Sequence, residues 1–448
     1  MEVIGMKFNS FVMRVILIAS IVLSIILSWK IWTNNTHYER RTDSQTTTKA
    51  VSRKSDRKIS DIFLPTQILW RTNQQSQLVY NSKESLVPKL KEAMKLTKSA
   101  RFKASKLSEA NYYQAITTDD TLTLLYPDNI SYAVFKKVFD DSNNQLSRNT
   151  TFNRIKITMG NKPQLTLMND KSHMTYQTTM RQFSEAQVKR ILDHSDVHLN
   201  VKESLLNHKP FIYVAADQSL LPYSYLVNQQ PENYYITTLL DQKNTDNIDA
   251  KEQGDNVIYT DGANNDLYKR LTINHKTGEI AFVKYEDTKS PTGLTKSFET
   301  SFAALLKTGN SLSGMRFYSY DEDTNSTTYR TYVEGFPVFY QTNFGSVKVQ
   351  LLPTGQRVDF SNYSLQVPVP AGDKPVALPS TQAVLNQMTK NGFLLENIDN
   401  IQVGYEWTQE TSNNQVIDLN PTYFIQYKGV WRSLSALLAQ KAELTEGS

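Results

Sequence analysis

The sequence contains no cysteine among its 448 residues. A chain without cysteine has no thiol nucleophile and no thiolate metal site. This composition fits an exported protein that avoids unpaired thiols in an oxidising space. Glycine (16) and proline (15) are also scarce, whereas tyrosine (24) and phenylalanine (19) are abundant. Because aromatic residues favour strands, we expect a mixed α+β body.

Signatures of phosphate binding and of serine hydrolases are absent as well. The patterns G-x-x-x-x-G-K-[ST], G-x-G-x-x-G and G-x-S-x-G do not occur in the sequence. Excess charge of one sign is confined to residues 1–58, which hold ten Lys/Arg and four Asp/Glu and so carry +6. Since the whole chain carries +5, residues 59–448 carry −1. A nearly neutral body argues against nucleic acid as a partner.

One long apolar run is present near the start, over residues 11–32. As a helix, these 22 residues would cover roughly 33 Å, which is enough to cross a bilayer. Arg14 and Lys30 can extend to the two interfaces, and Trp29 and Trp32 suit the headgroup region. The run ends in "SWKIWTNN", which lacks the small residues of a signal-peptidase site, so we predict an uncleaved transmembrane anchor.

The orientation of this anchor follows from the body behind it. Lys and Arg are more numerous after the run than before it, and a bare positive-inside count would place the C-terminal side in the cytoplasm. Long domains, however, cross largely regardless of charge, and the chain has no cysteine. We therefore expect a cytoplasmic tail (1–10) and an extracellular body. Residues 33–58 lack apolar periodicity and are predicted to form a basic, flexible stalk facing anionic lipid or wall polymer.

Within the anchor, Ser20, Ser24 and Ser28 recur every four residues. They therefore lie on one face of the predicted helix, where small residues allow a partner helix to approach closely. The alternative is that each hydroxyl bonds to a carbonyl of its own helix. We predict that the three serines face a partner helix.

The body is predicted to contain three mixed α+β domains, at 59–204, 205–309 and 310–448. Hydrophobic periodicity and turn residues predict strand 121–130, ending in a turn at Pro127, and hairpin 152–167, turning at Gly160. In the last two domains a hairpin precedes a helix, which suggests related modules: 267–286 then 294–309, and 345–365 then 380–392. Other predicted elements are helices near 86–96, 131–140 and 184–192, and strands at 401–410 and 416–431.

Two short clusters could hold a metal ion. His194, Asp196 and His198 have a spacing that suits a divalent metal if the segment is helical, although a polar helix end is the simpler interpretation. The segment "DEDTNS" (321–326) offers carboxylates, but it lacks the glycine and the distal glutamate of a calcium loop. A hairpin tip is therefore favoured there, and we predict no cofactor.

A serine acyltransferase of the penicillin-binding type is the main enzyme alternative. Ser55-x-x-Lys58, Ser142-Asn143-Asn144 and Lys276-Thr277-Gly278 match its three motifs. Ser55, however, lies in a polar, charged stalk that cannot lower the pKa of a lysine by burial. The third motif recurs at residues 307–309, so it carries little weight. A second alternative is an extracellular binding module for wall polymer or peptide, with Tyr223, Tyr225, Tyr234 and Tyr235 as its platform; the simpler interpretation makes these half-buried strand residues.

Four segments resemble the YycH (WalH) family: "ISDIFLPTQILW", "LTLLYPDNISYAVFKKVF", "FIYVAADQSLLPYSY" and "VGYEWTQETSNNQVIDLNPTYFIQYKGVW". The likeness covers nearly the whole chain. It implies a membrane-anchored, non-enzymatic regulator with a three-domain extracellular body, which acts with a sister protein, YycI, on the sensor histidine kinase WalK. It also implies that membrane helices contact the kinase, and it supplies no catalytic residues. Members of the family either repress or activate the kinase, so the resemblance leaves the direction open.

Overall fold

The computed structural model divides into two compact units, residues 1–53 and 54–448, and each is considered by itself. In the first unit it describes only Leu17, Ser20, Ile21 and Ser24, all in helical conformation. The body is described over residues 57–81, 85–94, 101–141, 146–180, 183–215, 218–240, 248–261, 268–286, 291–310, 312–340, 342–369, 374–409 and 415–446. Within this part of the chain, no helix has the length and hydropathy needed to span a bilayer.

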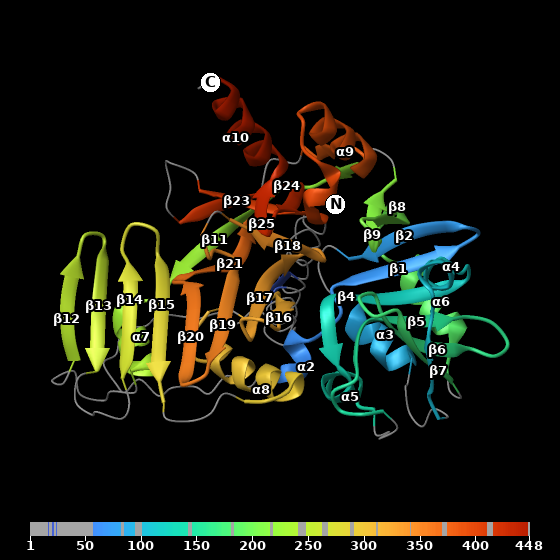
Figure 1. The fold of residues 1–448 in the computed structure, drawn as a ribbon, viewed down its shortest axis with the longest axis horizontal. Coiled ribbons are helices and arrows are strands. Elements are labelled where there is room, and N and C mark those ends of the chain that lie inside the picture. Colours follow the sequence, from blue (N-terminus) through green and yellow to red (C-terminus); the bar gives the residue numbers. More distant parts are fainter. Residues whose placement is uncertain are drawn as a thin grey trace, which may run out of the picture. The chain divides into compact units, whose positions relative to one another are not determined.

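The first sheet of the body has nine strands, all paired antiparallel (Figure 1). Its strand order is β3 (Lys103–Lys106), β7 (Met174–Thr179), β6 (Gln164–Asn169), β5 (Thr151–Thr158), β4 (Thr121–Ser131), β1 (Gln67–Thr72), β2 (Gln75–Tyr80), β8 (Val197–Leu206) and β9 (Lys209–Val214). The domain boundary predicted after residue 204 falls inside β8, because β8 and β9 complete this sheet.

Helices cover both faces of the first sheet. One face packs on α3 (Val87–Met94), α5 (Tyr132–Phe139) and α6 (Glu185–Asp193), and the other contacts α4 (Glu109–Ile116) through Met168. Ser131 and Ser184 begin α5 and α6, where their hydroxyls accept the N–H groups of Val134 and Gln187. These N-caps satisfy donors that a helix leaves free, so the predicted helices at these positions are confirmed.

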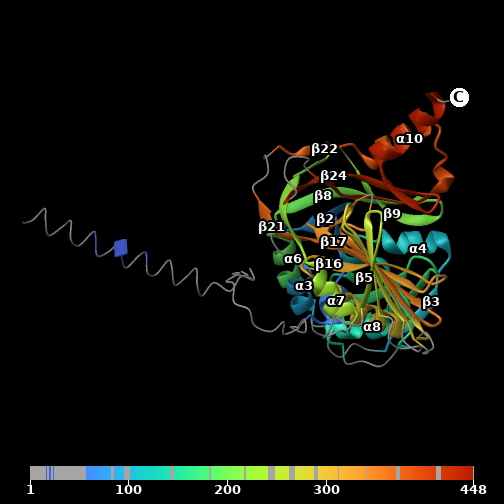
Figure 2. The ribbon, with the colours of Figure 1, turned by 90° about the vertical axis from the view of Figure 1, so that its left-hand side faces the viewer.

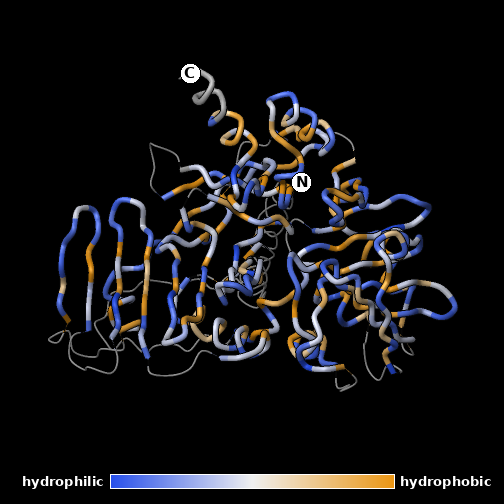
Figure 3. Tube along the Cα trace, viewed as in Figure 1, coloured by the Kyte–Doolittle hydropathy of each residue, from blue (hydrophilic) through white to orange (hydrophobic). Residues whose placement is uncertain are grey.

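The second sheet links the rest of the body. Its main path is β12 (Ile248–Gln253), β13 (Asn256–Asp261), β14 (Lys269–Asn274), β15 (Glu279–Tyr285), β20 (Gly355–Ser361), β19 (Ser346–Leu352), β17 (Ser326–Val333), β18 (Phe336–Phe339), β23 (Ile398–Gln409), β24 (Val416–Tyr427), β11 (Tyr223–Gln229) and β21 (Tyr363–Val369). Off this path, β16 (Met315–Asp321) pairs with β17, and β25 (Val430–Ser433) pairs with β24. Hydrophobic and hydrophilic residues alternate along strands such as β19 (Figure 3).

The remaining elements pack around this sheet. Helix α8 (Leu294–Leu305) contacts β17 and β19, and α10 (Leu434–Glu446) leads to the C-terminal end (Figure 2). The others are α7 (Glu232–Leu239), α9 (Thr381–Lys390), the 3-10 turn η2 (Leu395–Asn397) and the small β10 (Gln218–Leu220)–β22 (Val376–Leu378) ladder. The mixed α+β class is confirmed.

The two predicted hairpins, β14–β15 and β19–β20, are confirmed, but they are not separate modules. Strands β15 and β20 pair directly along their length, from Glu279 opposite Ser361 to Tyr285 opposite Gly355. An unpaired strand edge exposes backbone donors and acceptors. By joining into one sheet, the two hairpins supply hydrogen-bond partners for each other's edge strands. The repeated order of elements therefore does not reflect two domains in tandem.

The turn predicted at Pro127 is a bulge inside β4. Leu125 and Ile130 both pair with β5, and the register shifts between them. Proline has no N–H to contribute to a ladder, which a bulge tolerates better than a regular strand does. Asp128, within the bulge, accepts the backbone N–H of Tyr320 at 3.0 Å. The irregular stretch thus ties the first sheet to β16.

The segment that enters the body, α2 (Ile59–Ile62) and the following Phe63, lies in its core. The α2 helix contacts α5, which covers the first sheet, and β16, which belongs to the second sheet. The ring of Phe63 is fully buried and lies 4.9 Å from the rings of both Phe298 and Phe317. Contacts between packed aromatic rings stabilise a core beyond the area that they bury. The start of the body therefore joins its two halves.

Gly355, at the β19–β20 turn, has no room for a side chain. Its φ is +136°, and an added Cβ would overlap the carbonyl oxygen of Lys284. We expect Gly355→Ala to lower the free energy of unfolding by about 2–3 kcal/mol, because both strain and overlap must be relieved. Urea unfolding of the full chain in detergent, followed by tryptophan fluorescence, measures this loss.

The matched control is Gly160→Ala, since Gly160 has φ +113° and no atom within 4 Å of its added Cβ. It retains the backbone strain without the overlap, so we expect a loss of about 1 kcal/mol. Equal losses in the two variants would contradict a steric cause at Gly355.

Candidate functional site

A cavity of about 340 Å³ lies between the first sheet and the β17–β18 hairpin. Cavities of about 300–1,000 Å³ commonly hold small organic ligands. On the side of the first sheet it is lined by the start of β1 and the residues before it, the end of β2 and the start of α3. On the side of the second sheet it is lined by β11, the start of β16 and the β17–β18 hairpin. Its wall combines apolar side chains with a few polar groups that could orient a ligand.

The acidic group of this cavity comes from a tight turn. Tyr332 pairs with Pro337 and Val333 with Phe336, which leaves Glu334 and Gly335 as a two-residue hairpin loop. Both have positive φ, +51° and +79°, as the favoured type I′ turn requires. Asn or Asp is usual at the first of these positions. A glutamate here accepts an unfavourable backbone conformation while it places a carboxylate at the cavity.

Aromatic residues surround the Glu334 carboxylate. The hydroxyl of Tyr223 donates a hydrogen bond to its Oε1, and the ring of Tyr223 lies 5.7 Å from that of Tyr405. Tyr80 packs edge-on against Phe336 at 5.4 Å. The hydroxyl of Tyr80 is buried and has no hydrogen-bond partner within the described residues. The site therefore offers two oxygen acceptors set among rings.

Burial, and secondly the charge of Asp196, raises the pKa of Glu334 to about 7. No Lys, Arg or His among the described residues forms an ion pair with this carboxylate. The cavity also borders Arg316, whose Nη1 donates to the carbonyl of Met315 at 2.7 Å. Burial lowers the pKa of Arg316 to about 10, so it remains charged at neutral pH. Glu334 thus forms no ion pair among the described residues, and the charged Arg316 lines the same cavity without bonding to it.

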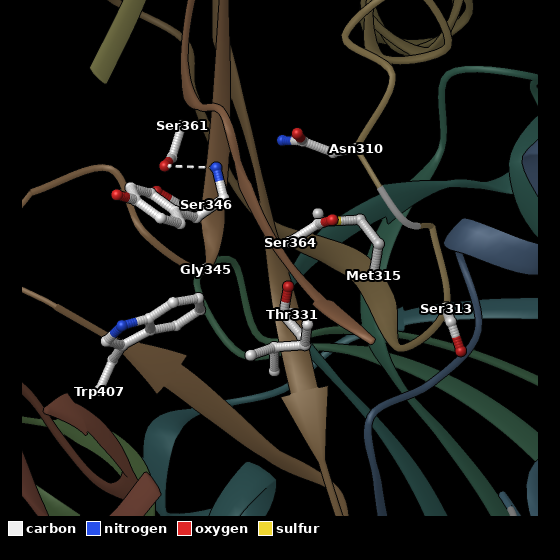
Figure 4. A pocket seen from close by; sticks show the side chains of 11 residues that line it. Asn310, Ser313, Met315, Thr331, Gly345, Ser346, Ser361, Ser364 and Trp407 are labelled. Carbon is white, nitrogen blue, oxygen red and sulfur yellow. Dashed lines mark hydrogen bonds between the residues drawn. The ribbon is translucent and has the colours of Figure 1, made fainter. Parts of the chain in front are cut away.

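A second, much smaller cavity lies near Trp407 (Figure 4). Its volume is about 10 Å³, which is about the space of one water molecule. Its polar wall includes Asn310 and Ser361, and the hydroxyl of Ser361 accepts the N–H of Tyr363 at 3.1 Å. No organic ligand fits this space, so we do not regard it as a binding site.

A buried ionic cluster lies elsewhere on the first sheet, beside α4. Arg154 donates to Asp170 and to Glu203, each at 2.6 Å, and Tyr112 donates to Asp170 at 2.7 Å. Burial raises the pKa of Glu203, and the charge of Arg154 opposes this rise. Burial also lowers the pKa of the neighbouring Lys156 to about 8. Arg154 pairs with both acids, so the contacts of this cluster are made within the body itself.

The predicted anchor residues are only partly described. Ser20 and Ser24 are exposed and helical, and the hydroxyl of Ser20 donates to the carbonyl of Leu17 at 2.9 Å. This bond is the one expected if serines bond to their own helix, and it does not prevent close helix contact. Five further predicted residues lie outside the described part: Arg14, Ser28, Trp29, Lys30 and Trp32.

The histidine pair does not have helical spacing. Helix α6 ends at residue 193, so His194 caps the helix and contacts the carbonyl of Arg190 at 2.9 Å. His198 lies in β8, where it contacts Ser195 at 2.9 Å and Gln77 at 3.1 Å. The two imidazoles therefore serve different local contacts. Among the described residues, no group of three His, Asp or Glu side chains is placed to hold a metal ion.

The other motifs have structural roles. Asp321 accepts the N–H groups of Asp323 and Thr324, which confirms a hairpin tip. Residues 276–278 form the β14–β15 turn, in which Gly278 has φ +71°. Ser55 and residues 142–144 lie outside the described part.

Of the four predicted platform tyrosines, Tyr223 and Tyr225 line the large cavity. Tyr234 and Tyr235 belong to helix α7 rather than to a strand, and Tyr235 is fully buried. Glu334, Tyr80 and Arg316, which also line this cavity, were not predicted from the sequence. The one local signal was the Glu-Gly pair between two apolar strands, where Asn-Gly or Asp-Gly would be usual.

Comparisons with known proteins define the family. Residues 11–197 match the YycH protein N-terminal domain, and residues 243–443 match the YycH protein C-terminal domain. The chain therefore belongs to the YycH family. Membership of this family indicates a regulatory accessory protein that associates with the WalK kinase.

The fold agrees with this assignment. The crystal structure of YycH from Bacillus subtilis aligns with a TM-score of 0.66 and 15% sequence identity, over 85% of this chain and 98% of that chain. At this identity the likeness concerns the fold alone. No curated protein sequence matches.

Proposed function

We propose that the protein is a membrane-anchored, non-enzymatic regulator of a WalK-like sensor histidine kinase that controls cell-wall homeostasis. It acts through transmembrane-helix and body contacts, together with a YycI-like sister protein. The observation that carries this proposal is the match of two YycH domains, one after the other, over most of the chain. The apolar run at residues 11–32 supports the anchor.

The proposed topology places the N-terminus in the cytoplasm and the body outside. Because the chain has no cysteine, a single introduced thiol reports its own location. We expect Asp323→Cys, at an exposed hairpin tip, to react with a membrane-impermeant maleimide on intact cells. Ser10→Cys, in the proposed cytoplasmic tail, should react only after permeabilisation. The reverse pattern would contradict the topology.

The serine stripe is proposed as the contact with a partner helix. Replacing Ser20, Ser24 and Ser28 together by leucine should weaken association with the kinase helix at least about tenfold in a bilayer reporter, because close approach is lost. The Ser→Ala triple variant keeps the residues small and should retain most of the association.

The matched control places leucine at Ile18, Val22 and Ile26, which fall on the opposite face if the predicted helix is regular. This variant should associate as the native chain does. If both leucine variants associate normally, the stripe is not the contact.

The cavity favours a second candidate, an extracellular binding module for wall polymer or peptide, because Tyr223 and Tyr225 line it. Exchanging the anchor for an unrelated transmembrane helix separates the two candidates. A regulator of the proposed kind would lose kinase signalling, measured with a WalR-dependent promoter, whereas a binding module would retain its ligand.

A further inference from the structure

We propose that the cavity beside Glu334 binds a ligand through a primary ammonium group carried on an apolar stem. Glu334 would accept the ammonium, the surrounding tyrosine and phenylalanine rings would enclose it, and the apolar wall would hold the stem. This inference goes beyond the proposed regulatory function, because it assigns a ligand site to the body.

The charge of Glu334 favours a cationic ligand. Glu334 receives one hydrogen bond, from Tyr223, although a carboxylate has about four acceptor positions. Among the described residues, the charged group that shifts its pKa is Asp196, which is itself acidic. Arg316 borders the same cavity but donates to its own strand. A half-buried acid that forms no ion pair is unfavourable, and a bound ammonium group would supply the missing partner.

The acceptors on Glu334 and Tyr80 match the donors of an ammonium group. An ammonium group has three hydrogens to donate. One can go to Glu334, and another to the buried hydroxyl oxygen of Tyr80, which has no partner within the described residues. Tyr80 and Glu334 are close enough that the charge of Glu334 raises the pKa of Tyr80, after the larger effect of burial. A neutral alcohol could use these acceptors but would leave the carboxylate uncompensated.

The wall around these acceptors is made of aromatic rings and apolar side chains. Tyr80, Tyr223, Tyr225 and Phe336 all line the cavity, and the faces of aromatic rings attract cations, as in the cages that bind alkylated amines. Beyond the rings, the wall includes Ile68, Leu78, Val79 and Leu86, which suit an alkyl stem. Beside Glu334, this combination favours an alkyl ammonium over a fully polar ligand.

The test is ligand-observed NMR on the full chain in detergent, with n-butylammonium as the probe and n-butanol as its neutral isostere. Fragments of this size bind with dissociation constants of about 1–10 mM. We expect saturable binding of n-butylammonium in this range, at least tenfold weaker binding of n-butanol, and at least a tenfold loss in Glu334→Gln. Glu322→Gln, at an exposed position, removes the same charge elsewhere and should bind as the native chain does.

Three results would overturn the inference: no saturable binding up to about 100 mM, equal binding of the alcohol, or undiminished binding by Glu334→Gln. Circular dichroism of each variant shows whether a loss reflects misfolding, and Tyr80→Phe supplies a second variant that removes only the free hydroxyl. None of these measurements depends on kinase signalling, so the outcome is independent of the proposed regulatory function.

Discussion

Replacing Arg154 by leucine should lower the free energy of unfolding by about 3–5 kcal/mol, because it leaves buried acids without their cation. Arg154 is 3% exposed and holds both Asp170 and Glu203 at 2.6 Å. The side chain of Glu203 is 1% exposed, so water cannot replace the lost partner. Urea unfolding of the full chain in detergent, at pH 8, measures the loss.

Two further measurements identify the cause of this loss. Burial raises the pKa of Glu203, and without Arg154 the carboxyl can escape the penalty by taking up a proton; the loss should therefore shrink as the pH falls from 8 to 5. Replacing Arg154 and Glu203 together by leucine should cost less than Arg154→Leu alone, since the fully buried acid is gone as well.

The control is Arg357→Leu, which breaks the partly exposed pair with Asp359 at 2.8 Å. Exposed ion pairs contribute about 0–1 kcal/mol, so this variant should remain close to the native chain. A similar loss in Arg154→Leu and Arg357→Leu would mean that burial of the acids is not the cause.

The second large effect is expected at Glu334, where glutamine should make the body more stable. A glutamate carboxyl ordinarily has a pKa of 4.5, and burial, with the charge of Asp196, raises that of Glu334 to about 7. The folded state therefore prefers the protonated form. Below pH 4.5 the acid is neutral in both the folded and unfolded states, and as pH rises toward 7 the native chain loses stability that Glu334→Gln retains.

The full pKa shift would correspond to about 3 kcal/mol, but Glu334 is partly exposed, so we expect a difference of roughly 1–2 kcal/mol at pH 8. Asp196, Tyr80, Tyr223 and Tyr405 interact with this carboxylate, Tyr225 and Arg316 line the same cavity, and all are retained in the variant. Urea midpoints measured between pH 4 and pH 8 give the profile. Glu322→Gln should show no such pH dependence, and a Glu334→Gln variant that is less stable at every pH would contradict the assignment.

Local chemistry explains which parts of the fold could be predicted. Hairpins β5–β6, β14–β15 and β19–β20 turn at glycines between alternating strands, and helices α5, α6 and α9 begin after serines that cap them. All these signals lie within a few residues of each other. Periodicity and turn residues are therefore enough to predict these hairpins and helices.

Contacts between distant segments could not be predicted in the same way. The pairing of β15 with β20 joins residues about 75 apart, and no local pattern distinguishes it from pairing within separate modules. The cavity likewise combines Tyr80, Tyr223 and Glu334, which come from three distant segments. The sequence marks Tyr223 as one of several clustered tyrosines. Its neighbours in the cavity, Tyr80 and Glu334, are brought to it only by the tertiary fold.

The position of Phe63 has a mechanical consequence. Tension that reaches the body through the chain before Ile59 would act first on α2, which contacts both α5 and β16. To yield, the body would have to withdraw a fully buried ring from its contacts with Phe298 and Phe317 rather than release a surface loop. In the proposed topology, a pull from the bilayer would thus be shared at once by α5, which covers the first sheet, and by β16 of the second sheet.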